Sequence, residues 1–360
     1  GADAGMGEWD YAHCLPYFKK MESCIAADSS DKFRGKSGPL HMERGAVKNP
    51  LFGAFFKAVQ EAGHPITQDV NGYQQEGFAA FDRNVKRGRR YSAARAYLHP
   101  VKHRKNLTVQ CRAFVTKVTT DGKTATGVEY ELPFGRKRSV QAKEIILCGG
   151  AFNSPQLLQV SGIGNSEELK KVGITPVHHL PGVGENLQDH YQARVIVKLR
   201  NKISLNDDVR NPLRLAQMGA QWLFQKRGPL TVGAGQVGGL ACTEHAQGGR
   251  ADVLFNVMPL SVDKPGDSLH RFSGFSASAT QCRPVSSGTV QLQSADRDAL
   301  YSGQQQSLQR SSSDTYLRHF VYRHFQVALG RSDHLLATVF HEGLRLQREK
   351  ILQVRSLQGS

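Results

Sequence analysis

The sequence predicts a mixed α/β fold, α+β overall, with an antiparallel sheet in its second half. Three observations carry this prediction. Apolar residues recur at helical spacing in residues 49–63, two β-rich runs flank Asp121-Gly122, and further β-rich runs follow residue 250. A chain of 360 residues can also bury a large core.

The first hundred residues read as helices separated by loops. Residues 9–22 form an aromatic-rich turn that leads into a short amphipathic helix. A second helix occupies residues 49–63, and Gly63 is placed to end it. Residues 92–98 return to helix, with Ser92 as its N-cap.

From Asn106 the pattern changes to strands. Residues 107–118 and 125–131 are β-rich and are joined across Asp121-Gly122, a strong hairpin signal. Residues 145–148 form a short apolar run that is typical of a buried strand.

Helical signals follow that run. Ser154-Pro155 supplies an N-cap and a proline at the first helical position. Asn165, with Glu168 three residues later, predicts a capping box for a helix that Gly173 ends. Residues 174–180 resume as strand.

The remaining elements are strands and a tail of unusual composition. Residues 251–258, 274–280 and 289–292 are expected to be strands of an antiparallel sheet. After about Ala295, lysine becomes scarce and arginine, glutamine, serine and histidine dominate. Residues 302–313 are low in complexity, and the apolar residues beyond them fit neither a sheet nor a capped helix.

The charge pattern bears on which partners the protein could bind. The net charge is +16, with the densest basic runs at 86–90, 99–105 and 136–138. We interpret these runs as a solvated basic face, while an anionic partner such as a membrane surface stays open. Aromatic residues do not alternate with them, which argues against a specific nucleic-acid platform.

The expected location is the cytoplasm, with peripheral contact with a membrane as an alternative. The six cysteines are scattered without CxxC or zinc spacing, which favours free thiols in a reducing compartment. No run approaches 18 apolar residues, and the first residues do not resemble a signal peptide.

The turn at Gly149-Gly150 is a candidate anion-binding site. It lies between an expected strand and an expected helix, where missing side chains allow a ligand to approach free backbone N–H groups. Many βα turns share this pattern, so by itself it does not identify a ligand site. No GxGxxG motif follows an expected strand in the chain.

A longer run is far more specific. The residues Gly150-Ala151-x-x-Ser154-Pro155-x-Leu157-Leu158-x-x-Ser161-Gly162-Ile163-Gly164 resemble, position by position, the second signature of the glucose-methanol-choline (GMC) oxidoreductase family. Further segments resemble the family in the same order, among them Ser92 to Pro100 and Leu180 to His190. The resemblance covers residues 9 to 295. Over this range the sequence is similar to the choline dehydrogenase and aliphatic alcohol dehydrogenase branch of the family.

The resemblance implies FAD as the cofactor and a Rossmann-like FAD-binding domain, here partial, beside a substrate domain with an antiparallel sheet. The family position whose backbone lies against the adenine matches Val115, and the turn close to the flavin matches Gly149, Gly150 and Ala151. Asp189 and His190 match a segment that packs near the cofactor, with a structural turn as the alternative. No metal-binding residue is assigned, because no His/Cys cluster in the sequence has zinc spacing.

The resemblance also implies that the chain is divided into four consecutive segments. We expect a cap or substrate-side segment at 1–106, part of the FAD-binding domain at 107–190, the substrate-binding sheet domain at 191–296 and an atypical tail at 297–360. The tail departs from the family pattern, and we interpret it as a loss of the reading frame near Asp296. The nucleotide sequence tests this hypothesis, since a single-base shift should restore a family-like C-terminus.

Two features of the family pattern are missing from the sequence. They are the GxGxxG turn that holds the flavin pyrophosphate and the histidine base in an HPxGT context, so the chain is interpreted as a fragment and no catalytic residue is assigned. We therefore expect this chain alone to be inactive.

The implied reaction is FAD-dependent oxidation of a primary alcohol to an aldehyde by a CH–OH oxidoreductase. Gln236 occupies a position where choline-oxidising relatives carry a glutamate, which favours a neutral alcohol substrate over choline. Choline dehydrogenase proper is one alternative, and a non-catalytic basic remnant that binds nucleic acid or anionic lipid is another. The electron acceptor is not identified, so a flavin oxidase that uses oxygen is a further alternative.

Overall fold

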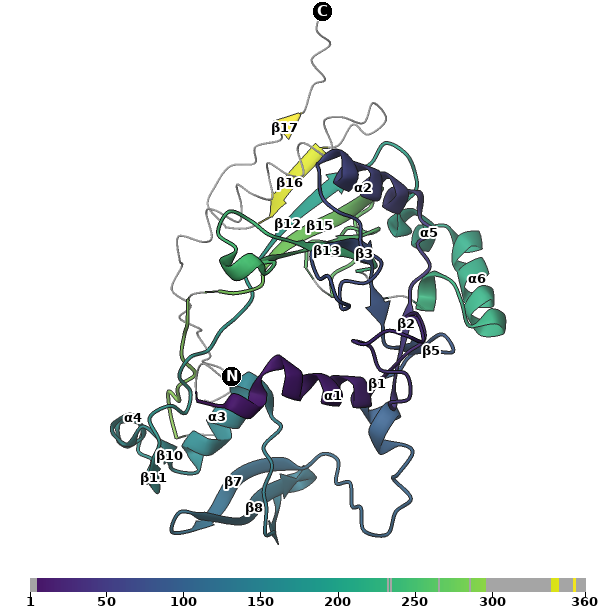
Figure 1. The fold of residues 1–360 in the computed structure, drawn as a ribbon. Coiled ribbons are helices and arrows are strands. Elements are labelled where there is room, and N and C mark those ends of the chain that lie inside the picture. Colours follow the sequence, from purple (N-terminus) through teal and green to yellow (C-terminus); the bar gives the residue numbers. More distant parts are fainter. Residues whose placement is uncertain are drawn as a thin grey trace, which may run out of the picture. The chain divides into compact units, whose positions relative to one another are not determined.

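The computed structural model describes residues 5–295, apart from positions 232, 234, 265 and 285, together with the backbone of residues 338–342 and 352–353. The chain divides into two compact units (Figure 1). Unit 1 comprises residues 1–104, 191–283 and 314–360, and unit 2 comprises residues 105–190 and 284–313. The four segments expected from the sequence stay a prediction, and most of the expected tail at 297–360 lies outside the described residues.

Unit 1 is built on a six-stranded antiparallel sheet. Its strands, in spatial order, are β13 (Val237–Ala241), β14 (Val253–Met258), β15 (Gly274–Gln281), β12 (Gln192–Lys198), β16 (Thr338–Glu342) and β17 (Leu352–Gln353). The predicted antiparallel sheet is confirmed, and part of the tail pairs with it. The strand expected at 289–292 is wrong, because Val290 and Leu292 hydrogen-bond instead to the loop at Gly184 and to the Gln159 side chain.

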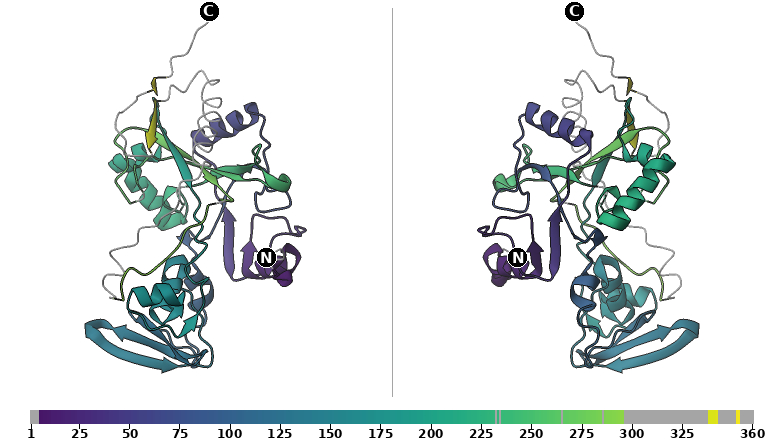
Figure 2. Two further views of the ribbon diagram at one scale, coloured as in Figure 1. Left: turned by 90° about the vertical axis from the view of Figure 1, so that its left-hand side faces the viewer. Right: turned by 90° about the vertical axis from the view of Figure 1, so that its right-hand side faces the viewer.

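The helix predicted at 49–63 is confirmed as α2 (Pro50–Glu61), and it covers one face of this sheet. The Asn49 side chain accepts a hydrogen bond of 2.9 Å from the Leu51 amide, Pro50 occupies the first helical position, and Gly63 adopts a φ of +82°. Phe52 is buried in a core with a residue of its own helix and residues in or next to β12, β13, β14 and β15: Leu51, Val197, Leu199, Val237, Val257, Phe275 and Ala277. Figure 2 shows α2 and α6 on opposite sides of the sheet.

The other elements of unit 1 surround the sheet. They are η2 (Gly7–Trp9), α1 (Tyr11–Met21), β1 (Glu22–Cys24), β2 (Leu40–Arg44), β3 (Gly77–Ala80), β4 (Asp82–Arg83), β5 (Val85–Lys86), β6 (Arg89–Arg90), η3 (Ala94–Leu98), α5 (Leu205–Arg210), α6 (Pro212–Ala220), η5 (Gln221–Gln225), η6 (Pro229–Thr231) and η7 (Gln247–Gly249). The helix predicted within residues 9–22 is confirmed. Ser92 is not an N-cap, because η3 begins at Ala94 without a capping side chain.

A buried ion network joins β1, β4 and the loops beside them. Arg34 bonds to Glu22 at 2.8 Å, to Asp82 at 2.8 Å and to Asp69, and Arg44 bonds to Asp82 at 3.0 Å. Burial alone lowers the pKa of Arg34, but its hydrogen bonds to Glu22 and Asp82 outweigh that effect and raise the pKa above its usual range. The guanidinium therefore stays charged.

Unit 2 contains the predicted hairpin and the helices that follow it. Its elements are β7 (Phe114–Asp121), β8 (Thr124–Leu132), η4 (Pro133–Gly135), β9 (Arg136–Gln141), α3 (Gly150–Val160), β10 (Ile163–Gly164), α4 (Ser166–Lys171) and β11 (His178–His179). Strands β7, β8 and β9 form one antiparallel sheet, with a positive φ of 55° at Gly122 in the β7–β8 turn. Asn165 caps α4 as predicted, but Glu168 pairs with Lys171 and the expected strand at 174–180 shrinks to β11.

Two predictions around the glycine pair are wrong. Residues 145–148 are extended but lie outside the described strands, and Ile146 is 76% exposed. A buried parallel strand needs neighbouring strands, and an apolar run alone does not reveal whether they are present. Helix α3 begins at Gly150, so Ser154 lies inside it, where its hydroxyl accepts a hydrogen bond of 3.0 Å from the Gly149 amide.

Candidate functional site

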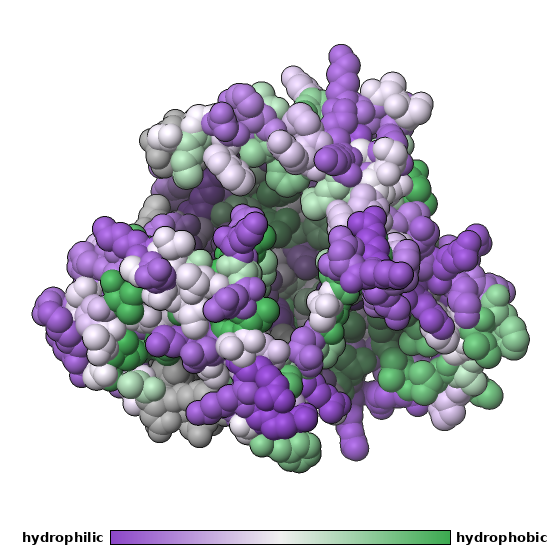
Figure 3. All heavy atoms as spheres, turned by 90° about the horizontal axis from the view of Figure 1, so that it is seen from below, coloured by the Kyte–Doolittle hydropathy of each residue, from purple (hydrophilic) through white to green (hydrophobic). Residues whose placement is uncertain are grey.

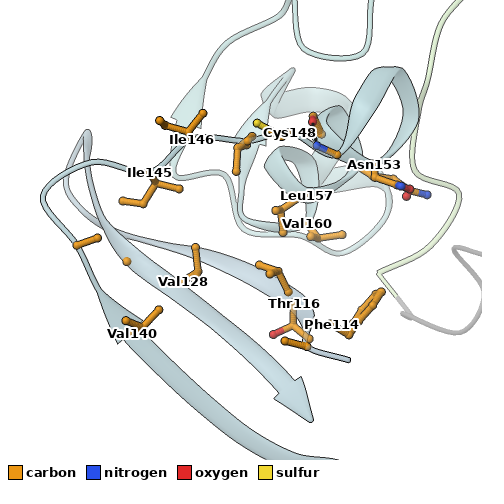
Figure 4. A pocket seen from close by; sticks show the side chains of 18 of the residues that line it. Phe114, Thr116, Val128, Val140, Ile145, Ile146, Cys148, Asn153, Leu157 and Val160 are labelled. Carbon is orange, nitrogen blue, oxygen red and sulfur yellow. Dashed lines mark hydrogen bonds between the residues drawn. The ribbon is translucent and has the colours of Figure 1, made fainter. Parts of the chain in front are cut away.

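A groove with a volume of about 790 Å³ opens in unit 2 between the β7–β8–β9 sheet and helix α3 (Figure 4). Residues 145–149 cross between these two walls. We call this cavity the unit 2 groove. Its lining is mainly apolar, and among the described residues Glu144 is the one charged side chain that contributes. The apolar side chains are Phe114, Val115, Val128, Val140, Ile145, Ile146, Leu147, Leu157 and Val160.

The turn that leads into α3 requires both of its glycines. Gly150 adopts a φ of +83°, which L side chains rarely tolerate. A Cβ on Gly149 would lie 3.0 Å from the Asn153 Cβ and 3.1 Å from the Ser154 amide nitrogen. The missing side chains leave the backbone of this turn accessible, and the first N–H groups of α3 can face an anion.

The structure brings some of the predicted cofactor residues together. Val115 on β7 and Gly149 before α3 both line the unit 2 groove. Gly150 and Ala151 are the first two residues of α3, directly beyond the lining. His190 is exposed and does not line this groove, so its role stays a prediction.

Gln236 lies in unit 1, immediately before β13. Its carbonyl oxygen accepts a hydrogen bond of 2.9 Å from the Phe81 amide. Gly235, the residue before it, packs against the Asn256 side chain. The segment of the predicted substrate residue therefore contacts β14.

Polar groups that were not predicted from the sequence lie on one face of the unit 1 sheet. Gly238, Asn256, Ser278 and Arg194 are in register across β13, β14, β15 and β12. The Oδ1 atom of Asn256 and the hydroxyls of Ser276 and Ser278 are buried without a hydrogen-bond partner among the residues that the structure describes. Alternating serines in a β-rich run were the signal that could have found this face.

The letters GxGxxG do occur once, at 233–238, but in a different structural setting. This run leads into β13 and does not connect a strand to a helix. A Cβ on Gly238 would clash with the Phe255 carbonyl oxygen, and one on Gly239 would clash with that of Gly77. The glycines of β13 therefore serve close strand packing.

Two polar residues of the signature run hold unit 2 together. The buried Ser161 hydroxyl donates to the Leu157 carbonyl at 2.6 Å and accepts from the Val118 amide at 2.9 Å, which ties α3 to β7. The Gln159 amide bonds to the Val290 carbonyl at 2.8 Å and to the Leu292 amide at 3.2 Å. These residues support the α3 wall of the groove.

Replacing Ser161 by alanine leaves the buried Val118 amide unsatisfied, so we expect β7 to lose about 1–3 kcal/mol of local stability. Hydrogen exchange at the β7 amides should accelerate by about 5- to 150-fold. Ser139→Ala on the exposed strand β9 is the control and should leave these rates unchanged. Equal rates in both variants would contradict the assigned role of Ser161.

Residues 1–192 match the model of the GMC oxidoreductase family. The chain belongs to this family. Oxygen-dependent choline dehydrogenases from Staphylococcus aureus (strain MSSA476) and Staphylococcus saprophyticus are each 45% identical to it over 292 residues, or 81% of this chain. These matches cover 51% and 52% of the relatives, so the chain spans about half the length of the curated relatives it matches.

Solved structures share the fold at lower identity. Formate oxidase from Aspergillus oryzae has a TM-score of 0.81 at 19% identity, covering 93% of this chain and 63% of that one. Pyridoxine 4-oxidase from Mesorbium loti has a TM-score of 0.74 at 23% identity, covering 92% and 60%. The α/β fold of a GMC oxidoreductase, an enzyme family that acts on CH–OH groups, is thus shown for this chain.

FAD is the cofactor of the family, and the unit 2 groove fits part of it. The apolar walls and the side-chain-free Gly149 suit a flat aromatic group such as adenine. Among the described residues that line it, none is basic, and the first N–H groups of α3 are groups that can face the negative charge of a pyrophosphate.

Two further features concern the part of the chain that the structure describes. In that part of the chain, no group of three or more His, Cys, Asp or Glu side chains is arranged to hold a metal ion. The helices there include none that combines the length and the apolar composition needed to cross a bilayer.

Proposed function

We propose that this chain contributes the adenine side of the flavin site and the substrate-side sheet to FAD-dependent oxidation of a primary alcohol to an aldehyde. The observation that carries the proposal is the unit 2 groove, in which Val115 and Gly149 lie on the walls of one apolar cavity. Membership of the GMC family supports the reaction class.

The chain's own residues have separable tasks in this proposal. Bound FAD would accept a hydride from the alcohol carbon. Val115 and Gly149 would hold the adenine and exclude water from it, while the first N–H groups of α3 would face the cofactor's negative charge. The buried Asn256 and Ser278 oxygens can hydrogen-bond an alcohol hydroxyl.

We expect no turnover from the 360-residue chain by itself. Its sequence contains no HPxGT histidine, and general-base assistance is typically worth about 10²- to 10⁴-fold. No GxGxxG turn follows a strand to hold the pyrophosphate, so flavin should be lost on gel filtration. Purified protein with stoichiometric flavin that oxidises an alcohol would overturn this expectation.

The adenine site is tested by equilibrium titration with FAD and with ADP. Gly149→Val fills the groove beside Asn153 and Ser154, so it should weaken both ligands at least about tenfold. Gly182→Ala is the matched control in unit 2, because a Cβ there meets nothing within 4 Å. Equal affinity in the two variants would place the ligand elsewhere.

The substrate is proposed to be a neutral primary alcohol, with choline as the second candidate. The names of the 45%-identical relatives favour choline, whereas the neutral Gln236 gives no carboxylate to balance a quaternary ammonium. Saturation-transfer NMR with choline and 1-butanol separates the two. We expect transfer to butanol in the natural chain and transfer to choline only in Gln236→Glu; choline binding to the natural chain would favour the second candidate.

A further inference from the structure

Helix α6 runs on into η5 with apolar side chains turned to solvent. Leu213 is 83% exposed, Phe224 is 80% exposed and Leu223 is 55% exposed. Figure 3 shows hydrophobic side chains gathered over these elements, at the right of the view, beside strongly hydrophilic ones. Exposure of this extent on consecutive turns is unusual for a surface helix, which normally presents polar residues to water.

The apolar residues follow the helical repeat. Leu213, Ala216, Ala220 and Phe224 are exposed and recur at intervals of three or four residues, so they share one face. Met218 is buried on the other side. The helix is thus apolar both toward the protein and toward solvent.

A basic hairpin lies directly against this helix. It joins β5 to β6 through Arg87 and Gly88. The Trp222 indole donates a hydrogen bond of 2.9 Å to the Gly88 carbonyl, and the Arg89 guanidinium lies 5.6 Å from the Trp222 ring centroid. A Cβ on Gly88 would clash with the Lys226 carbonyl, so the hairpin turn and the end of the helix are in close backbone contact.

Together the helix and the hairpin form an apolar strip bordered by cations. The basic side chains of the two segments are Lys86, Arg87, Arg89, Arg90, Arg210, Arg214, Lys226 and Arg227. Residues 209–231 contain no aspartate or glutamate. We call this surface, formed by residues 84–91 and 209–231, the α6 patch.

We propose that the α6 patch docks unit 1 on an anionic lipid bilayer. Exposed leucine and phenylalanine side chains would enter the interface between headgroups and acyl chains, where apolar burial is favourable. The cations of the hairpin would lie at the level of the headgroups, each contributing attraction to anionic lipids. One surface therefore supplies the two signals that stable peripheral binding requires.

The composition of the patch favours lipid over the other partners of a basic surface. Its most exposed apolar residues are mainly aliphatic, whereas single-stranded nucleic acid needs aromatic side chains for base stacking. A second copy of the chain would bring like charges face to face, which opposes association. An anionic bilayer satisfies the charge and the apolar strip together.

Co-sedimentation of the purified 360-residue chain with vesicles tests the proposal. The chain should bind vesicles of about three parts phosphatidylcholine to one part phosphatidylserine and should bind pure phosphatidylcholine at least about tenfold more weakly. Leu213→Gln with Phe224→Ser should weaken binding at least about tenfold through lost apolar burial. Lys86→Glu with Arg90→Glu should weaken it at least about tenfold through charge reversal.

Matched controls lie in unit 2. Phe134→Ser removes another exposed phenylalanine, and Lys137→Glu with Arg138→Glu reverses another exposed basic run. Both controls should bind the vesicles as the natural chain does. Equal weakening in control and patch variants would show a general charge effect and overturn the proposal, as would no binding to the anionic vesicles.

Light scattering and DNA titration test the two other partners that the α6 patch could bind, which are a second copy of the chain and DNA. The natural chain and the Leu213→Gln/Phe224→Ser variant should both be monomers. DNA should bind to this variant as strongly as it binds to the natural chain. A dimer that this variant abolishes would identify the patch as an interface between copies and overturn the lipid assignment. DNA affinity lost in this variant while vesicle binding is retained would overturn it as well.

Discussion

Replacing Arg34 by methionine is expected to lower the free energy of unfolding of unit 1 by about 3–5 kcal/mol. The variant removes the cation that Glu22, Asp69 and Asp82 share and leaves three carboxylates around an apolar side chain. Arg34 is 3% exposed, so water cannot replace the lost bonds without opening the structure. Urea unfolding followed by tryptophan fluorescence measures this loss, because Trp9 and Trp222 both lie in unit 1.

Lys57→Met is the matched control for this experiment. Lys57 pairs with Glu61 at 3.8 Å on the surface of α2 and is 80% exposed, so its loss should change stability by less than about 1 kcal/mol. If Arg34→Met unfolded at the same urea concentration as Lys57→Met, the buried ion network would not contribute to the stability of unit 1.

Phe52→Ala is expected to cost unit 1 about 3–5 kcal/mol. The ring is 1% exposed between α2 and the sheet, where it belongs to the same core as Val197, Val237 and Phe275. Its removal leaves a cavity that these strand residues cannot fill without moving. The change is read from the midpoint of thermal unfolding by circular dichroism.

Phe224→Ala provides the comparison for that measurement. Its ring is 80% exposed, so truncation should shift the midpoint little. Comparable shifts in the two variants would mean that α2 does not pack on the sheet as described.

Local signals in the sequence predicted local elements well. Asn49, Pro50 and Gly63 mark the ends of α2, and the Asp121-Gly122 pair marks the β7–β8 hairpin. These features depend on contacts within a few residues, which propensity and capping rules describe. Elements that depend on distant partners were harder to predict.

The segment around residues 145–148 shows where such reasoning fails. Its apolar run predicts a buried strand, yet Ile146 is exposed and the segment crosses the unit 2 groove outside the described strands. Whether an apolar run forms a buried strand depends on the strands beside it, and the pattern of the run itself does not show whether those strands are present. The start of α3 was misplaced for a related reason, because Gly150 enters the helix through a positive φ that no cap residue announces.

The candidate site was predicted through resemblance more than through local chemistry. A family signature pointed to Val115 and to Gly149, and the structure places both on one groove. The polar face of the unit 1 sheet was not predicted, because it forms only when strands pair. Asn256 on β14 lies directly opposite Ser278 on β15. Residues 22 positions apart in sequence meet there only through strand pairing.

Hydrogen exchange at saturating FAD shows directly whether the unit 2 groove binds the adenine side of FAD. We predict protection in two separate peptides, residues 113–118 of β7 and residues 145–151 before and at the start of α3, with α4 unchanged. These peptides form different walls of the groove, so a ligand between them must slow both. Bound FAD that leaves both peptides unprotected would mean that the adenine does not bind in this groove.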